Sequence, residues 1–441
     1  MRKFFLNILL LSFSILLFTA CTSTKQISKT TPLNYIINDS NFTNAHFGVA
    51  LYKPSSNSFL LQHQSNKLFV PASNTKIITC YTSLKNLGDS LLSMQYYETD
   101  TSIHVLGVAN PINMHQDFAY QPTINFLKNQ SKKIYLHNNF FEAEGLGFGW
   151  AWDDYEATYM AERSFLPLYS NVVTFFKDSG NFTSTPAYFS NNSFKNNHKN
   201  KTGFDISRKL ATNEMFTING RDDKPKEITF STQNPKTKEG LQFACNLLSE
   251  AVGKPIYTGD KFDKLNAKSL YNISTDSVLK TMMHQSDNFL AEQCLLMSSY
   301  AKLGIMSDDK MIGEMLKTEF ANMPQKPKWV DGSGLSRYNL FSPEDFVFVL
   351  NKMKKEISWD RIKTIFTTGN EGTLKGLYKN YEGNIFAKTG TLSNHVGLSG
   401  YLITKKGEEL IFSVLVNHYT TSASNIRKTI EKMITQIIEE Y

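Results

Sequence analysis

Cysteine is scarce in this chain, with four residues in 441, so disulfides cannot carry the fold. After Cys21 only Cys80, Cys245 and Cys294 remain, and they show no metal-binding spacing. The nine histidines form no HExxH pattern, so a metalloenzyme is not favoured, and we expect no metal and no cofactor. We expect buried free thiols at Cys80 and Cys294, with a disulfide between them as the alternative.

Dense blocks of one charge are also missing. The chain has 47 Lys and Arg against 40 Asp and Glu, a formal charge of +7, and no Lys/Arg-rich run. A nucleic-acid partner is therefore not expected. The length suggests two or three domains with room for a large core.

Only one apolar run is long enough to interact with a membrane, and it lies at the N-terminus. Phe4 to Phe18 follows Arg2 and Lys3 and ends at Thr19, Ala20 and Cys21. This is the layout of a secretory signal, and it is shorter than the ~20 residues of a spanning helix. Small residues before a cysteine resemble a bacterial lipobox, with an ordinary signal peptide as the alternative.

The sequence thus predicts a signal peptide over 1–20, then a lipidated Cys21 and tether over 21–42. Cleavage would remove Arg2 and Lys3, which lowers the charge to +5. The body would lie in a bacterial periplasm, anchored by lipid to a membrane, for which we expect the outer membrane.

Strand-like and helical patterns at the two ends of the chain flank a long middle. Residues 45–64, with the segments HFGVALYK, PSSN and SFLLQHQ, predict a hairpin, and an apolar face after Ser73 predicts a helix. Strands are predicted again near 384–417, followed by an amphipathic helix over about 422–440. We predict an α/β (α+β) domain formed by 43–92 and 265–441, with an antiparallel sheet covered by helices. Residues 93–264 would be a largely β insertion.

The candidate nucleophile is Ser73, which opens the predicted helix with Lys76 one turn later. Residues i and i+3 share a helix face, so the lysine amine can reach the serine hydroxyl and act as its base when neutral. The S-x-x-K pattern alone is weak, because Ser277 and Lys280 also match it on what reads as a solvated helix face.

Two further motifs follow in order. Ser286-Asp287-Asn288 lies within a stretch with helical patterns, and Lys388-Thr389-Gly390 leads into a predicted strand, where we expect an exposed edge that could pair with an extended peptide. A second Lys-Thr-Gly at 201–203 reads as a turn. S-x-x-K, S-D-N and K-T-G together are the signature of class A β-lactamases and penicillin-binding proteins.

The chain resembles the D-alanyl-D-alanine carboxypeptidase/endopeptidase family typified by penicillin-binding protein 4 (peptidase family S13). The 213 residues from Ser73 to Ser286 are too many for a class A β-lactamase, whereas this family carries an insertion there. Segments similar to those of the family occur from about 47 to 418. These segments are PASNTK, GWAWDDYEATYMAE, QSDNFLAEQCLL, DGSGLSRYNLFSPEDF, GNEGTL and AKTGTLSNHVGLSGYL. The chain departs from the family pattern at ANPIN, residues 109–113.

The resemblance implies a β-lactamase/transpeptidase-like fold and a serine acyl-enzyme that cleaves peptidoglycan stem peptides and is acylated by β-lactam antibiotics. It assigns catalysis to Ser73, Lys76, Ser286, Asn288 and Lys388. Substrate binding falls to Thr389, Gly390 and Thr391, and to Asp154 and Arg337, for which a structural ion pair is the alternative. For Asp287 we favour a helix-capping or solvated role over substrate binding. A β-lactamase or esterase of the same fold, or a non-catalytic cell-wall-binding lipoprotein, remain the alternatives.

Overall fold

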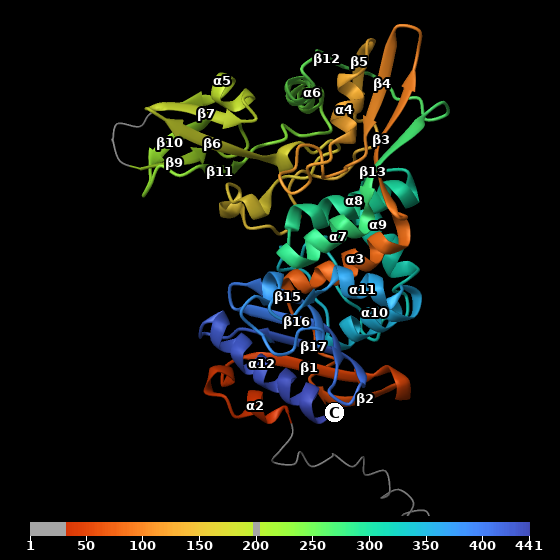
Figure 1. The fold of residues 1–441 in the computed structure, drawn as a ribbon, viewed down its shortest axis with the longest axis vertical. Helices are drawn as coiled ribbons and strands as arrows, with labels where there is room; N and C mark the ends of the chain where they lie inside the picture. The colour runs from red at the N-terminus through yellow and green to blue at the C-terminus, as the bar shows by residue number, and fades with distance from the viewer. Residues whose placement is uncertain (1–31, 197–202) are drawn as a thin grey trace, which may run out of the picture.

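A six-stranded antiparallel sheet organises one end of the molecule (Figure 1). The computed structural model describes residues 32–196 and 203–441. The sheet joins the two ends of the chain, because the N-terminal hairpin pairs with the last strand: Ala50 of β1 lies opposite Ser413 of β17. In spatial order its strands are β14 (Thr367–Thr368), β15 (Ile385–Leu392), β16 (His395–Ile403), β17 (Glu409–Asn417), β1 (His46–Lys53) and β2 (Ser58–His63).

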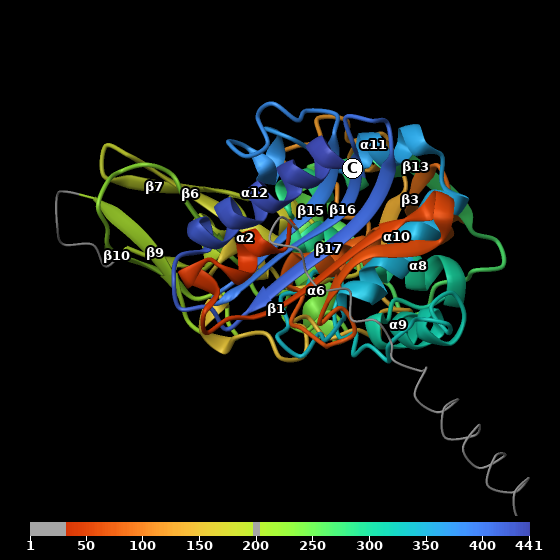
Figure 2. The same cartoon turned by 90° about the horizontal axis from the view of Figure 1, so that it is seen from below.

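Both faces of this sheet are covered, so its strands are apolar on both sides. Along β1, Val49 and Leu51 pack toward α12, whereas Ala50 and Tyr52 pack into the core on the opposite face, as the two-residue period of a strand requires. Figure 2 shows α12 (Ala423–Glu440) lying across the sheet, next to α2 (Asn34–Ile37). The other face carries α3 (Thr75–Asn86) and α10 (Pro343–Glu356).

The segment just after residue 32 is folded, contrary to the tether predicted over 21–42. Leu33, Ile36 and Phe42 are buried against α12, and a short turn, η1 (Ser40–Phe42), leads into β1. Cys21 and the predicted signal peptide lie outside the described residues. Three apolar side chains spaced along 33–42 are enough to pack this segment onto α12.

A buried helix forms the centre of the second layer. Every residue from Phe289 to Tyr300 of α8 (Asn288–Leu303) is buried, since α3, α7 (Thr275–Gln285) and α9 (Asp308–Lys317) surround it. Short α11 (Trp359–Ile365) packs against α7. Cys80 and Cys294 are buried free thiols, as predicted. Within 32–196 and 203–441, no helix is both long and apolar enough to cross a membrane.

The middle of the chain forms three further sheets, at the top of Figure 1. A mixed five-stranded sheet packs against α4 (Pro122–Lys128) and α6 (Lys238–Val252), and two three-stranded sheets with α5 (Tyr188–Asn192) form a lateral arm. The strands are β12 (Ile256–Thr258), β5 (Lys133–His137), β4 (Ser102–Gly107), β3 (Ser90–Glu98) and β13 (Lys268–Ser274); then β8 (Phe194–Lys195), β10 (Met215–Asn219) and β9 (Phe204–Arg208); and β11 (Lys226–Thr229), β6 (Val172–Asp178) and β7 (Asn181–Thr185).

The predicted boundaries of the insertion, 93 and 264, cut through the five-stranded sheet. Strand β3 already begins at Ser90, and β13, which we had placed in the outer part, pairs with it antiparallel. The chain therefore enters and leaves this region on two adjacent strands. This position brings α3 and α7, which carry the first two motifs, close together at the junction.

Candidate active site

The candidate nucleophile occupies a tight turn at the start of α3. Ser73 lies in the turn η3 (Ala72–Asn74) and is partly exposed, whereas Lys76, one turn later, is fully buried. Ala72 adopts a left-handed backbone with φ of +50°, and its carbonyl accepts a hydrogen bond from Thr75 Oγ1 at 3.0 Å. Such a conformation is costly for a residue with a Cβ and needs support from its surroundings.

That support comes from Gly334, which has φ of +82°. A Cβ at Gly334 would lie 1.9 Å from the Ala72 carbonyl oxygen, so only glycine lets the two chain segments approach. The turn also approaches β15, where a Cβ at Gly390 would lie 2.7 Å from the Pro71 carbonyl oxygen. The Ser73 turn is thus enclosed on both sides by close backbone contacts.

Lys76 has three oxygen partners. Its Nζ lies 3.1 Å from Ser73 Oγ, 2.6 Å from Asn288 Oδ1 and 2.8 Å from the Ser333 carbonyl oxygen. Burial lowers the pKa of Lys76 to about 8, against the opposing charges of Asp287, Asp331 and Glu292. An appreciable fraction of this amine is therefore neutral near neutral pH and can take a proton from Ser73.

The second motif forms the corner between α7 and α8. Ser286 ends α7 in the left-handed region, with φ of +61°, and α8 begins at Asn288. The Asp287 carboxylate caps α8 by accepting the backbone N–H of Leu290 at 2.8 Å, which confirms the capping role predicted for it. Because the corner is only two residues long, Ser286 and Asn288 both reach the site.

Lys388 on β15 completes the cluster. Its Nζ donates to Ser286 Oγ and to the Thr389 carbonyl oxygen, both at 2.9 Å. Burial, with the charge of Lys76, lowers the pKa of Lys388 well below its ordinary value. The expected exposed edge is only partly correct, since Lys388 is fully buried and β14 pairs with the two preceding residues. From Lys388 to Leu392, β15 has no strand partner on that side among the described residues.

The other residues proposed for β15 differ in exposure. Thr389 is partly exposed and Gly390 is buried, whereas Thr391 is exposed and its Oγ1 accepts a hydrogen bond from Arg427. Thr389 and Thr391 lie two residues apart on one strand, so both side chains face the same side of the sheet.

Asp154 and Arg337 both lie near Tyr159. Burial and a hydrogen bond to Asp154 raise the pKa of Tyr159 to about 12, against the positive charge of Arg337. The Tyr159 carbonyl accepts a hydrogen bond from Asn288 Nδ2 at 2.9 Å, which links this group to Lys76. Arg337 is exposed and free to meet a ligand.

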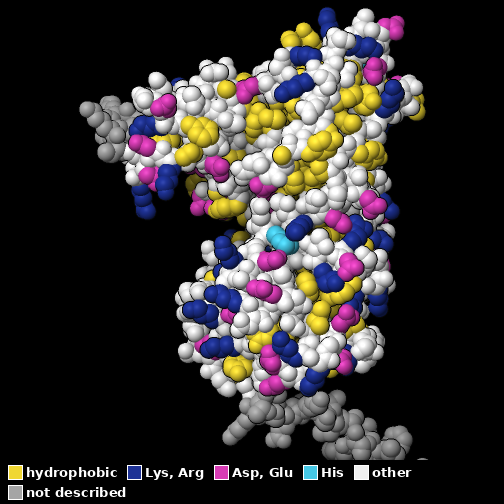
Figure 3. Space-filling model, viewed as in Figure 1, with side chains coloured by type: hydrophobic (Ala, Val, Ile, Leu, Met, Phe, Trp, Pro, Cys, Tyr) yellow, Lys and Arg dark blue, Asp and Glu magenta, His cyan; other side chains and the backbone are white. Residues whose placement is uncertain are grey.

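A cavity of about 450 Å³ adjoins this group. Its lining combines the corner 285–289, Tyr159, residues 114–117, and Val172 and Thr174 of β6. In Figure 3 a notch separates the lateral arm from the lower body of the molecule. The inserted region therefore forms one wall of the space next to Ser286.

The sequence interpretation missed the loop 331–334 as part of the site. The Asp331 carboxylate accepts hydrogen bonds from the backbone N–H groups of Gly334 and Ser336, and this folds the loop so that the Ser333 carbonyl faces Lys76. The sequence Asp-Gly-Ser-Gly is typical of a tight turn and could have predicted one here. No side-chain pattern, however, identifies a backbone carbonyl as a partner of Lys76.

A serine hydroxyl beside a buried lysine amine, close to a second serine–lysine pair, is an arrangement typical of serine hydrolases that use a lysine as the base. The sequence profile of the D-Ala-D-Ala carboxypeptidase 3 (S13) family matches residues 30–437. The chain belongs to this family and is a serine-type D-Ala-D-Ala carboxypeptidase, in agreement with the resemblance noted in the sequence.

Individual relatives agree over most of the chain. The chain is 24% identical over 412 residues to D-alanyl-D-alanine carboxypeptidase DacB of Haemophilus influenzae, which covers 83% of this chain and 84% of that protein. It is 21% identical to penicillin-sensitive carboxypeptidase A of Dictyostelium discoideum, over 87% and 85% of the two chains.

Two solved structures share the fold. Penicillin binding protein 4 (dacB) of H. influenzae superposes with a TM-score of 0.68 at 19% identity, over 90% of this chain and 96% of that chain. Bd3459, a predatory peptidoglycan endopeptidase of Bdellovibrio bacteriovorus, gives 0.53 at 16% identity, over 89% and 92%. The predicted α+β fold is confirmed.

Proposed function

We propose that the chain hydrolyses D-Ala-D-Ala bonds of peptidoglycan stem peptides, as a carboxypeptidase or endopeptidase, through an acyl-enzyme on Ser73. The observation that carries this proposal is the 3.1 Å contact between Ser73 Oγ and the buried Lys76 Nζ. The neutral Lys76 amine takes the Ser73 proton as Oγ attacks the substrate carbonyl. The backbone N–H groups of Ser73 and Thr391 are proposed to stabilise the oxyanion.

The second serine–lysine pair handles the leaving group. When the tetrahedral intermediate collapses, the C–N bond breaks and the departing amine takes a proton through Ser286, which lies 2.9 Å from Lys388 Nζ. Lys388 and Thr389 would also hold the terminal carboxylate of the substrate, and Asn288 the amide of its acyl part. Water then hydrolyses the Ser73 ester, with the proton passed back through the same groups.

Asp154 and Arg337 are proposed to contact the charged side chain of the stem peptide. Their carboxylate and guanidinium, which both act on Tyr159, would match a side chain that carries both an ammonium and a carboxylate. A β-lactam would acylate Ser73 by the same attack, and we expect a long-lived adduct, since no sequence motif for fast deacylation was found. The alternatives are a β-lactamase or esterase of the same fold and a non-catalytic wall-binding lipoprotein.

The test is labelling by a fluorescent penicillin together with D-alanine release from a stem pentapeptide. We expect labelling and D-alanine release with the wild type and neither with Ser73→Ala. Ser277→Ala is the control: it lies in the second S-x-x-K match, on the exposed face of α7, and should behave as the wild type. Labelling or release that survives in a folded Ser73→Ala protein refutes the serine mechanism. Fast nitrocefin turnover without D-alanine release would favour the β-lactamase.

Digestion of purified peptidoglycan separates the two peptidase activities. Mass spectrometry would show loss of a terminal alanine for a carboxypeptidase and loss of cross-links for an endopeptidase. We further propose export to a bacterial periplasm and lipid attachment at Cys21. Incorporation of a palmitate probe that is lost in Cys21→Ser, with labelling of Ser73 retained, would support the anchor, and no incorporation would refute it.

A further inference from the structure

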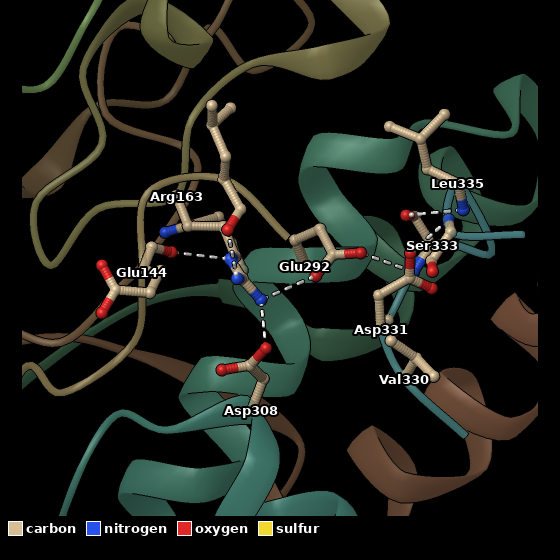
Figure 4. A network of polar contacts seen from close by, with 12 residues as sticks. Glu144, Arg163, Glu292, Asp308, Val330, Asp331, Ser333 and Leu335 are labelled. Carbon is tan, nitrogen blue, oxygen red and sulfur yellow. Dashed lines mark hydrogen bonds and ion pairs between the residues drawn. The ribbon is translucent and has the colours of Figure 1, made fainter. Parts of the chain in front are cut away.

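A buried ionic network lies behind the Lys76 amine (Figure 4). Arg163, from the inserted region, is 2% exposed, and its guanidinium contacts the carboxylates of Glu292 on α8 and Asp308 on α9. Its remaining N–H groups donate to the carbonyls of Glu144 and Leu146 at 3.0 and 3.2 Å. The network therefore joins the inserted region to the helix that begins with Asn288.

Glu292 faces the catalytic site with its other oxygen. Its Oε1 accepts the backbone N–H of Ser333 at 2.7 Å, and the carbonyl of Ser333 accepts from Lys76 Nζ at 2.8 Å. The backbone of one residue, Ser333, therefore connects the Glu292 carboxylate to the Lys76 amine. Figure 4 shows Glu292 between Arg163 and Ser333.

The position of the Ser333 carbonyl matters because a neutral amine has two hydrogens and one lone pair. The carbonyl of Ser333 and Oδ1 of Asn288 are the two shorter contacts of Lys76 Nζ, and both are acceptors only. If they take the two hydrogens, the lone pair is left for the third partner, Ser73 Oγ. If the Ser333 carbonyl were misplaced, the Lys76 amine could rotate, and its lone pair would no longer point toward Ser73 Oγ.

Burying a carboxylate at this position costs free energy. Between Phe289 and Tyr300 every residue of α8 is buried, and Glu292 is 1% exposed, so burial raises the pKa of its carboxyl. An apolar side chain could fill the same space without the cost of burying a charge. An apolar side chain could replace neither the contact to the Arg163 guanidinium nor the one to the Ser333 N–H, and only the latter leads to Lys76.

We propose that Glu292 is a positioning residue of the acyl-transfer site. Its carboxylate, balanced by Arg163 of the inserted region, holds the Ser333 peptide so that the carbonyl takes one hydrogen of Lys76 and the lone pair faces Ser73. This inference rests on the proposed function of Ser73 and Lys76. Glu292 touches neither substrate nor nucleophile and acts through Ser333.

The test compares three variants in the full chain, with the second-order rate of labelling by a fluorescent penicillin measured from pH 5.5 to 9.5. Glu292→Asp keeps the charge but withdraws it from the Ser333 N–H. We expect acylation to fall about 10- to 100-fold at every pH, with the pH of half-maximal rate unchanged. Glu292→Gln keeps the length and loses the charge. We expect its half-maximal rate at a lower pH, since Glu292 favours the charged form of Lys76.

Asp308→Asn is the matched control, because it removes a carboxylate from the same network without contacting Ser333. The charges around Lys76 are Asp287, Asp331, Glu292 and Lys388, and those around Glu292 are Arg163, Asp308 and Asp331. We expect the control to lower the melting temperature but to keep both the rate and the pH midpoint.

The proposal is overturned if both Glu292 variants label as fast as Asp308→Asn with an unchanged midpoint, or if both fail to fold while Asp308→Asn folds. Either result would make Glu292 a purely structural member of the network. Failure of the proposed function is distinguishable, because it would appear in the wild type itself or as labelling of Ser73→Ala.

Discussion

With Lys76 as the proposed base, we expect its protonation state to set the pH dependence of acylation, and Asp287→Asn should shift that dependence. With a pKa of about 8 in place of 10.5, roughly a tenth of this amine is neutral at pH 7, about 300-fold more than for an ordinary lysine. The wild-type rate should therefore rise about tenfold per pH unit below pH 7 and level off above about pH 9.

Asp287 is the strongest of the nearby charges that raise the pKa of Lys76. Removing its negative charge disfavours the ammonium, so the pKa falls and the acid limb moves to lower pH. A shift of about half a unit would give about threefold faster labelling at pH 6.5 and no change at pH 9.5, where the amine is neutral in both proteins. Asparagine can still accept the Leu290 N–H, so α8 keeps its cap.

The assay measures the second-order rate of labelling by a fluorescent penicillin from pH 5.5 to 9.5, as for the Glu292 variants. Asp309→Asn, an exposed carboxylate on the first turn of α9, is the control, and it should reproduce the wild-type profile. If the acid limb of the pH–rate profile stays in place or moves to higher pH in Asp287→Asn, the assignment of this limb to Lys76 is refuted. A wild-type rate independent of pH between 6 and 8 would refute the role of Lys76 as the base.

Three further changes test other parts of the structure. Gly334→Ala places a Cβ against the Ala72 carbonyl in a left-handed backbone, so labelling should fall at least about 100-fold, whereas wild-type labelling would contradict the close approach. Ser286→Ala removes the partner of Lys388 without a large change in packing. Acylation should fall about 100-fold at a nearly unchanged melting temperature, and an unaffected rate would argue against a proton path through Ser286. Phe42→Ala should destabilise the protein by about 3 to 5 kcal/mol in chemical denaturation, whereas a change below about 1 kcal/mol would mean that 33–42 is a tether after all.

Local patterns in the sequence predicted those elements whose signal lies within one segment. The strands β1, β2 and β15 to β17 are short apolar segments bounded by turn residues, and α12 has an apolar face with a helical period. The structure has these elements close to the expected bounds. The pairs Ser73–Lys76 and Ser286–Asn288 could be predicted because a helix start and a two-residue corner fix the spacing of their side chains.

Features that depend on pairing between distant segments could not be predicted in this way. The edge of β15 is partly covered by β14, a strand of two residues with no periodicity, and β13 joins β3 from the other end of the inserted region. The burial of Lys388 follows from its contact with Ser286, which lies 102 residues earlier in the chain. Alternation along a strand tells which residues share a face, but not what covers that face.

The inserted region has a physical link to the Lys76 amine, and this follows from where the hydrogen-bonding partners of Lys76 come from. One partner is on α8, one is in the loop 331–334 and one is Ser73, so no single element holds the amine. Arg163 contacts α8 and Tyr159 contacts Asn288, and both belong to the region between the first two motifs. We therefore expect that a substitution in that region can alter acylation without touching the substrate. These contacts favour the insertion as part of the support for the proposed base over a separate binding module.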